Sequence, residues 1–163
     1  MSMVVECHAV YPRGATLQDV LSAYRKKMNM RSTQMIDGVR MLHSNQDASS
    51  IVYNMLRTTP GWYKSLGGED SLTYNEVLEI DTVQNTMKTE SRSKLPLPIG
   101  SPLIQICIIF AEEDDFTVRA EGTVQIDNLP MVALPLKRII RSYVRQAFSR
   151  ERDLESQLLV SPV

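Results

Sequence analysis

Strict alternation of apolar and polar residues near the middle of the second half constrains the fold of this chain more than any other feature. The apolar positions are Phe116, Val118, Ala120, Gly122, Val124 and Ile126, and polar or charged residues stand between them. Because successive side chains of a strand point to opposite faces of a sheet, the pattern predicts one long strand over 116–127. One face of that strand is expected to be buried and the other solvated.

Six further segments have the composition and spacing of strands. They are residues 3–10, 35–43, 50–57, 72–80, 86–92 and 103–111. The turns expected at 44–47 and 81–85 are too short for the crossover that parallel strands require, so the sheet is predicted to be mostly antiparallel. Apolar residues occupy both alternating positions of 103–111, which is consistent with a strand covered on both faces.

Amphipathic helices flank this series of strands. Thr16 and Asp19 have the spacing of a capping box, and apolar residues follow at helical spacing as far as Met28. A longer helical pattern begins at Leu136 and extends to about Leu159. A short helical turn is also expected near 62–66, between the third and fourth strands.

The resulting order of elements is β-α-β-β-(short α)-β-β-β-β-α. The economical packing is a curved, mostly antiparallel β-sheet of about seven strands that grips the long C-terminal helix on its concave face. We therefore predict an α+β fold of the helix-grip type. A sheet and helix arranged in this way can enclose a cavity for an apolar ligand.

Length and composition bound the class of protein. The chain has 163 residues, of which 43% are hydrophobic and 23% charged, which suits one globular domain over 1–160 with a frayed tail at 161–163. A formal net charge of −1 gives no general argument for binding nucleic acid. No secretory signal is visible, and no apolar run approaches the ~20 residues that span a bilayer.

The sequence offers little for catalysis, and we predict that the protein is not an enzyme. The motifs of phosphate cradles, dinucleotide folds, zinc sites and activated nucleophiles are absent, so neither a cofactor nor a metal is expected. Cys7 and Cys107 are interpreted as buried thiols, although a disulfide between them stays open without geometry. An enzyme of this fold would need several titratable side chains to converge in a pocket. The candidates are His8, His43, Glu6 and Tyr24.

A basic stripe marks the C-terminal helix. Between Lys137 and Arg150 there are five basic residues and no acidic one. Arg138, Arg141 and Arg145 are spaced to share one side of a helix. Each basic residue near anionic lipid contributes about 1 kcal/mol, so the stripe predicts reversible docking on an anionic membrane surface or an acidic partner. A solvated helix face is the alternative interpretation.

Three segments resemble the PRELI/Ups family of phospholipid-transfer proteins. Residues 83–92, VQNTMKTESR, resemble the strand pair of that family, and residues 60–66, PGWYKSL, resemble its L-P-x-W segment. Residues 20–27, VLSAYRKK, resemble its first helix. The order and spacing of the three segments are also similar. Where the family has a Y-P-N-P turn after the first helix, residues 28–31 read MNMR.

This resemblance implies a START-like protein that transfers a phospholipid of the phosphatidic acid or phosphatidylserine class between membranes. It also implies the mitochondrial intermembrane space, with the cytoplasm as the alternative, and a small helical twin-CX9C chaperone as a possible partner. Lys27 and Arg57 match basic positions of the family and, together with Lys64, would bind the lipid head group. The lid over the pocket would comprise Pro60, Gly61, Trp62, Tyr63, Leu66, Gly67 and Gly68.

Two other functions stay open at this stage. The protein could be a START-like interaction module with a vestigial pocket that binds a protein partner through the basic helix. Large side chains that fill the concave face of the sheet would favour that interpretation. A small enzyme of the same fold is the third alternative.

Overall fold

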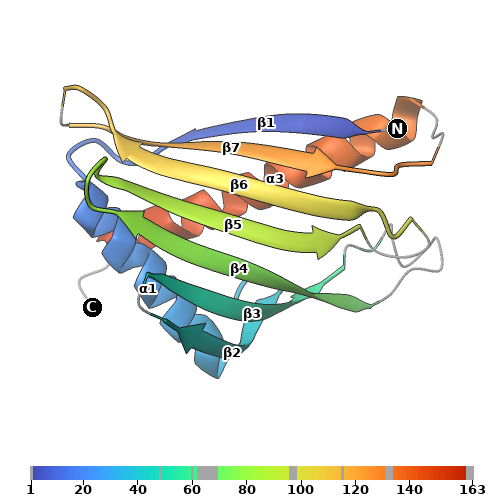
Figure 1. Ribbon diagram of the computed structural model, residues 1–163, viewed down its shortest axis with the longest axis horizontal. Helices are drawn as coiled ribbons and strands as arrows, with labels where there is room; N and C mark the ends of the chain where they lie inside the picture. The colour runs from blue at the N-terminus through green and yellow to red at the C-terminus, as the bar shows by residue number, and fades with distance from the viewer. Residues whose placement is uncertain are drawn as a thin grey trace.

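The computed structural model describes residues 2–47, 49–59, 61, 70–95, 99–114, 116–130 and 134–160. Within them, seven strands form one antiparallel sheet in the order β1-β7-β6-β5-β4-β3-β2 (Figure 1). The strands are β1 (Met3–Val10), β2 (Val39–Gln46), β3 (Ser50–Thr58), β4 (Ser71–Asp81), β5 (Thr86–Lys94), β6 (Pro102–Ala111) and β7 (Val118–Ile126). The helices are α1 (Leu17–Thr33) and α3 (Leu134–Val160).

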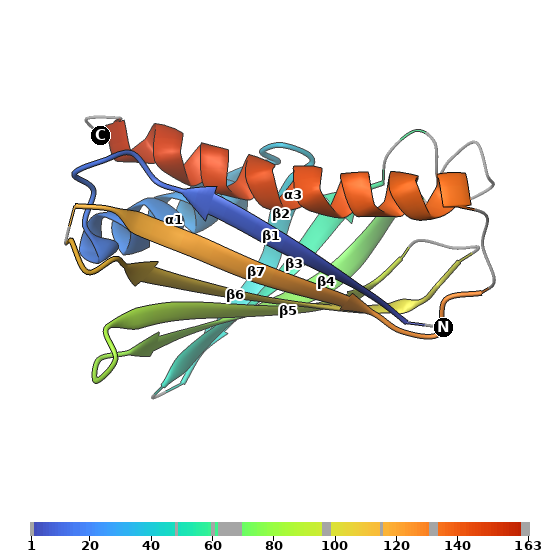
Figure 2. The ribbon, with the colours of Figure 1, turned by 90° about the horizontal axis from the view of Figure 1, so that it is seen from above.

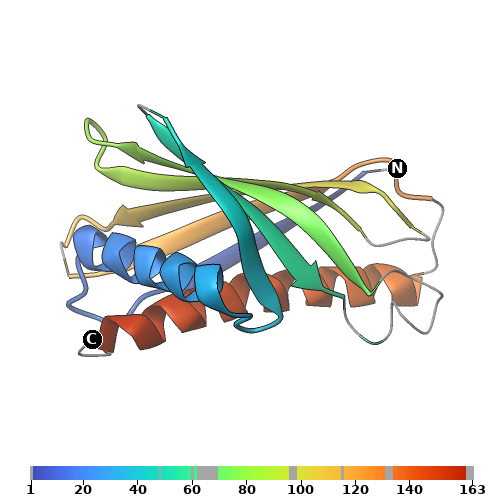
Figure 3. The same ribbon diagram turned by 90° about the horizontal axis from the view of Figure 1, so that it is seen from below.

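Both helices cover the same, concave face of the sheet. Figure 2 shows α3 running along the whole length of that face while the strands curve beneath it. Figure 3 shows α1 lying alongside the C-terminal half of α3. The predicted α+β helix-grip architecture and its order of elements are therefore confirmed. The short helical turn expected near 62–66 lies outside the described residues.

Strand β7 confirms the alternation of apolar and polar residues predicted for 116–127. Its apolar residues from Val118 to Ile126 are buried, and the residues between them are more exposed. Gly122 is needed on the buried face, because a Cβ atom there would lie 2.4 Å from a ring carbon of Phe148 on α3. Phe116, which the alternation placed in this strand, precedes it and is 58% exposed.

Helix α1 begins as predicted and ends later than predicted. The Thr16 side chain accepts a hydrogen bond from the Asp19 amide at 3.1 Å, and the Asp19 carboxylate accepts one from the Thr16 amide at 3.0 Å. The helix continues through residues 28–31 to Thr33. The segment that aligns with the family's turn is therefore helical here, and it buries Arg31.

The start of β2 was predicted four residues too early. Asp37 and Gly38 have φ angles of 49° and 74°, and they make a tight turn closed by the Ile36–Val39 bridge. Glycine tolerates this left-handed region without a steric penalty. The strand therefore begins at Val39 and extends through part of the expected turn to Gln46.

The interpretation of residues 103–111 as a strand covered on both faces is wrong. In β6, Cys107 and Ile109 are buried beneath the helices, but Ile108 on the convex face is 42% exposed. The antiparallel sheet therefore has one covered face and one wet face at this strand as well.

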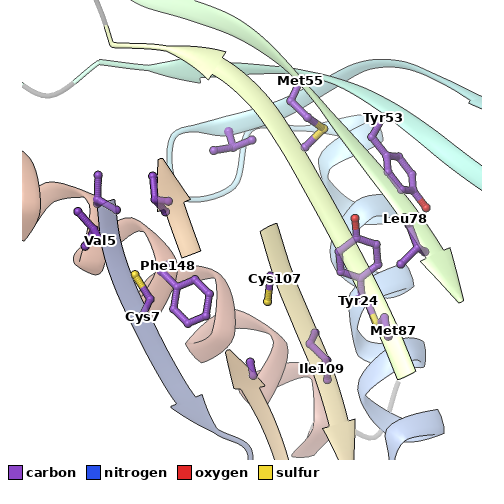
Figure 4. Close-up of a cluster of buried hydrophobic side chains, with 14 of the residues drawn as sticks. Val5, Cys7, Tyr24, Tyr53, Met55, Leu78, Met87, Cys107, Ile109 and Phe148 are labelled. Atoms are coloured by element: carbon purple, nitrogen blue, oxygen red, sulfur yellow. The ribbon is translucent and has the colours of Figure 1, made fainter. Parts of the chain in front are cut away.

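The two cysteines cannot form a disulfide in this fold. Cys7 on β1 and Cys107 on β6 both pair with Gly122, so β7 runs between them. Two strand spacings amount to about 9–10 Å, beyond the Cα separation of ~4.4–6.8 Å that a disulfide requires. Figure 4 shows the Phe148 ring between the two sulfur atoms. Burial raises the pKa of both thiols, which keeps them protonated and unreactive.

Among the described residues, neither helix combines the length and the hydrophobicity that crossing a bilayer demands.

Candidate functional site

Buried charges join α1 to the C-terminal half of α3. The Lys27 ammonium lies 2.5 Å from Glu155 Oε2 and 3.3 Å from Glu151 Oε1. One turn further along α1, Arg31 donates through both terminal nitrogens to the two oxygens of Glu151, each at 2.7 Å. A bidentate pair of this kind is among the stronger hydrogen-bonded contacts of a protein. These contacts hold the two helices in one register.

A second set of contacts surrounds Glu155. Arg152 Nε lies 2.8 Å from Glu155 Oε1, and the Tyr11 hydroxyl donates to the same oxygen at 2.6 Å. Arg152 Nη1 also donates to Cys107 Sγ at 2.9 Å. Three cations, Lys27 and two arginines, thus share two carboxylates in a buried cluster. Such a cluster does not guarantee net stability, but removing one member leaves an uncompensated charge.

The carboxylates of this cluster are held ionised. Burial alone would raise the pKa of Glu151, but Lys27 and Arg31 lower it well below its usual value. Burial acts on Glu155 in the same direction, and Arg152, Lys27 and the Tyr11 hydroxyl lower its pKa below the usual value. At both glutamates, the cations therefore lower the pKa by more than burial raises it.

Before Glu151 along α3, the contact between this helix and the sheet leaves empty space. A cavity of about 60 Å³ lies between the sheet and α3. A second cavity of about 150 Å³ adjoins it, because Arg57, Tyr143, Ala147 and Glu151 line both. Both apolar and polar side chains line the first cavity. The apolar ones include Leu72, Leu95, Leu103, Val124 and Val144, and the polar ones include Tyr74, Glu76, Ser91 and Gln105.

Arg57 on β3 lies at the junction of the two cavities. Its guanidinium carbon is 5.2 Å from the centre of the Tyr74 ring, a cation–π contact. Its Nε is buried without a hydrogen-bond partner in the described part of the chain. Burial alone would lower the pKa of Arg57, but Tyr74, Glu151 and Tyr143 raise it above its usual value. The side chain is therefore a fixed positive charge.

Arg57 differs from the other cations near Glu151. Lys27 and Arg31 each form an ion pair with that carboxylate. Arg57 forms no ion pair with any described carboxylate, although it lines the cavities beside Glu151. Glu151 binds two cations directly and stabilises the charge of Arg57 without an ion pair, so the Arg57 guanidinium keeps an unused donor at Nε for another anion.

Glu76 on β4 lines the first cavity from the floor of the sheet. It is 7% exposed, and its two carboxylate oxygens accept hydrogen bonds from the Tyr24 hydroxyl at 2.6 Å and the Ser91 hydroxyl at 2.9 Å. Among the described residues it forms no ion pair, so its partners are neutral donors. Tyr24 is itself fully buried against Tyr53, as Figure 4 shows.

Two of the head-group residues suggested by the family resemblance, Lys27 and Arg57, have different surroundings in the structure. Lys27 is 0% exposed, is bound by carboxylates, and lines neither of these cavities. Arg57 lines both of them. Lys64 and the expected lid residues Pro60, Trp62, Tyr63, Leu66, Gly67 and Gly68 lie outside the described residues, and Gly61 is exposed.

The basic stripe lies where the periodicity placed it. Arg138, Arg141 and Arg145 are exposed on α3 and line one shallow groove together with small polar residues of the same helix. Arg145 Nε also donates to the Glu6 carbonyl at 3.4 Å. Their common exposed side is confirmed, and a role in docking stays a prediction.

Sequence reasoning missed the buried charges of α3 and the carboxylate in the cavity. A signal for the first was present: Val144, Phe148, Glu151 and Glu155 recur at helical spacing on the side that faces the sheet and α1. The residues proposed for an enzyme do not converge. His8, His43 and Glu6 are exposed, and only Tyr24 is buried. The described residues also contain no cluster of three potential metal ligands.

The architecture is that of the helix-grip fold. Its structural neighbours include Ara h 8.0201, with a TM-score of 0.63 and 9% identity over 98% of this chain and 99% of that one. The ZhuI aromatase/cyclase from Streptomyces sp. R1128 has a TM-score of 0.56 and 9% identity, over 98% of this chain and 92% of that one. At such identities the likeness defines the fold alone.

A third neighbour is the di-domain ARO/CYC BexL from the BE-7585A biosynthetic pathway. Its TM-score is 0.63 at 10% identity, and the match covers 98% of this chain and 51% of that one. By sequence, neither a protein-family model nor a curated protein matches the chain. The resemblance to the PRELI/Ups family therefore stays a prediction.

Proposed function

We propose that this protein is a binding module for an amphipathic molecule that carries an anionic group. The observation behind the proposal is Arg57, a fixed cation that lines both cavities and forms no salt bridge within the described part of the chain. A guanidinium presents paired donors that match a phosphate or a carboxylate. The leucine and valine side chains of the first cavity would cover the hydrocarbon part of the ligand.

Within this class, the resemblance to lipid-transfer proteins supports a phospholipid of the phosphatidic acid or phosphatidylserine type. The cavities, about 60 and 150 Å³, are smaller than the ~300–1,000 Å³ of usual ligand sites. Two acyl chains would therefore require the N-terminal half of α3 to move away from the sheet. Arg138, Arg141 and Arg145 would hold the protein on an anionic membrane during the exchange.

The resemblance also supports the biological setting of this proposal. Transfer would take place between membranes in the mitochondrial intermembrane space, with a small helical twin-CX9C protein as partner. Binding and release need no covalent step, in keeping with the absence of catalytic motifs.

Native mass spectrometry with lipid extraction, on protein purified from cells, tests the proposal. We expect one amphipathic molecule per chain in the wild-type protein and its loss in the Arg57→Gln variant. Arg92→Gln is the matched control, because Arg92 is an arginine of β5 whose side chain is 66% exposed. Any lipid found is then tested in a vesicle transfer assay. A wild-type protein that stays free of ligand after incubation with anionic vesicles would contradict the proposal.

One observation favours the interaction module as the second candidate. Large side chains, among them Tyr24, Tyr53, Met55 and Phe148, are buried on the concave face and leave little space. In that case the exposed arginines of α3 would bind an acidic protein partner, and no ligand would co-purify. The same mass measurement therefore separates the two functions.

A further inference from the structure

Glu76 has acceptor capacity that its present partners do not use. An ionised carboxylate offers about four lone-pair positions. Tyr24 and Ser91 donate one hydrogen bond each to Glu76, and the carboxylate lines the cavity beside Ser91. A further donor can therefore approach it only from its neighbours or from the cavity.

Among the described residues, Glu76 is also the buried carboxylate with the fewest direct cationic contacts. Glu151 and Glu155 each contact two cationic side chains, whereas the described hydrogen-bond partners of Glu76 are two hydroxyl groups. Burying a charge is costly unless it is paired and hydrogen-bonded. A hydrogen-bond donor delivered into the cavity would reduce that cost.

The position of Glu76 relative to Arg57 defines a second contact point for a ligand. The Arg57 guanidinium lies over the ring of Tyr74. Tyr74 and Glu76 are two residues apart on β4 and both line the cavity. Two residues of a strand cover about 7 Å, so Glu76 follows Tyr74, the residue that Arg57 contacts, by one such step along β4 on the floor of the cavity.

We propose, on the basis of the anion-binding function, that the ligand carries a hydrogen-bond donor in addition to its anionic group. The anionic group binds Arg57, and a hydroxyl or amino group on the apolar part donates to Glu76. Glu76 is then a specificity-determining residue. A ligand without the donor would displace solvent from the carboxylate and return no hydrogen bond, and sites built in this way reject such analogues.

Isothermal titration calorimetry with matched acids tests this inference. The probes are hexanoate and decanoate, each compared with its ω-hydroxy derivative. We expect the hydroxy acid of at least one pair to bind wild-type protein about ten-fold more tightly, the effect of one hydrogen bond to a charged group. Glu76→Gln should remove most of that preference. Arg57→Gln should weaken both members of the pair by a similar factor.

Two further variants keep the test decisive. Glu79→Gln makes the same chemical change on β4 but on an exposed residue, and it should leave both affinities unchanged. If Glu76→Gln does not fold, Ser91→Ala replaces it, because this change removes one donor and keeps the carboxylate. The hydroxyl preference should then persist or increase, and its loss would contradict the inference.

The outcomes separate this inference from the function on which it rests. Equal, Arg57-dependent binding of both members of every pair overturns the role of Glu76 and leaves the anion site intact. A hydroxyl preference that depends on Glu76 but not on Arg57 supports the role of Glu76 and contradicts the anion site. No binding of any acid overturns both.

Discussion

The two halves of α3 differ in whether the buried charges beside them form ion pairs. Around Glu151 and Glu155, every cation of the cluster is bonded to a carboxylate, and the helix is held against α1. Around Tyr143 and Ala147, the same helix lies over two cavities and over Arg57, which forms no ion pair with a described carboxylate. Glu151 stands at the boundary, because it binds Lys27 and Arg31 and also lines both cavities. The C-terminal part is closed by paired charges, and the part before Glu151 leaves a cation without an ion pair.

This contrast separates a charge that supports the fold from a charge that can bind a ligand. Burial alone does not distinguish them, because Lys27 and Glu76 are both buried. The distinction lies in the partners. Where opposite charges are already bonded, removing one member should cost stability. Where a charged side chain faces a cavity and has an unused hydrogen-bond donor or acceptor, removing the charge should weaken ligand binding.

The largest effect is expected from Glu155→Gln, which breaks the closed half. The change removes the charge that Lys27 and Arg152 share. Loss of one partner from a buried ion pair typically costs about 3–5 kcal/mol, and urea unfolding measures it. Asp153→Asn, at an exposed position of α3, is the control and should change the free energy of unfolding little. A similar loss for both variants would show that the cluster has no special role.

Acid should weaken the same half. Both Glu151 and Glu155 have pKa values below the usual value. Because their folded-state pKa is depressed, their stabilisation is present above the unfolded pKa of about 4.3 and is lost as pH falls through the folded value. Each proton taken up contributes a slope of up to about 1.4 kcal/mol per pH unit. Unfolding free energies measured between neutral and acidic pH should show this decline, and Glu155→Gln should reduce its slope.

Gly122→Ala tests the contact of β7 with the middle of α3, where the two halves of the helix meet. The new Cβ would meet the Phe148 ring at 2.4 Å, and overpacking of this kind costs about 1–3 kcal/mol. Phe148→Leu in the same chain should recover part of the loss, because the two positions are in contact and should not be additive. Thermal unfolding of the two single variants and the double variant measures the coupling. Strict additivity would argue against this close approach.

The smallest effect on stability is expected from Arg57→Gln, in the open half. The variant loses a cation–π contact with Tyr74 and a hydrogen bond with Tyr143 but breaks no ion pair among the described residues, so the cost should be about 1 kcal/mol. The measurement is urea unfolding in the absence of ligand. If this variant is destabilised as strongly as Glu155→Gln, Arg57 belongs to the structural charges and the comparison between the two halves fails.

Patterns local in sequence allowed much of the fold to be predicted. The alternation in β7, the capping box at Thr16 and the helical spacing toward Leu159 all correspond to observed elements. Turns were harder, because the left-handed pair Asp37 and Gly38 stands within a segment that otherwise resembles a strand. The antiparallel pairing of the strands nevertheless followed from the shortness of the connections.

The candidate site was predicted less well, because its contacts join residues far apart in the chain. Lys27 was expected to face a lipid phosphate, and its observed partner Glu155 is 128 residues away. One sequence contains no signal for such a pair. Arg57 was singled out by the family resemblance, and its placement at the cavities could not be deduced from β3 alone. Glu76 gave no signal because a lone glutamate in a strand is usually solvated.

The position of β1 has a consequence for synthesis of the chain. Met3 pairs with Ile126, and the cations of α1 find their carboxylates only on α3. Since a ribosome releases the N-terminus first, the edge strand β1 must wait for β7 to emerge, and α1 must wait for α3. Pairings this distant in sequence make folding slow. Until then the nascent polypeptide exposes an incomplete sheet with an unpaired edge, together with unpaired cations. Its risk of aggregation is therefore greatest during translation.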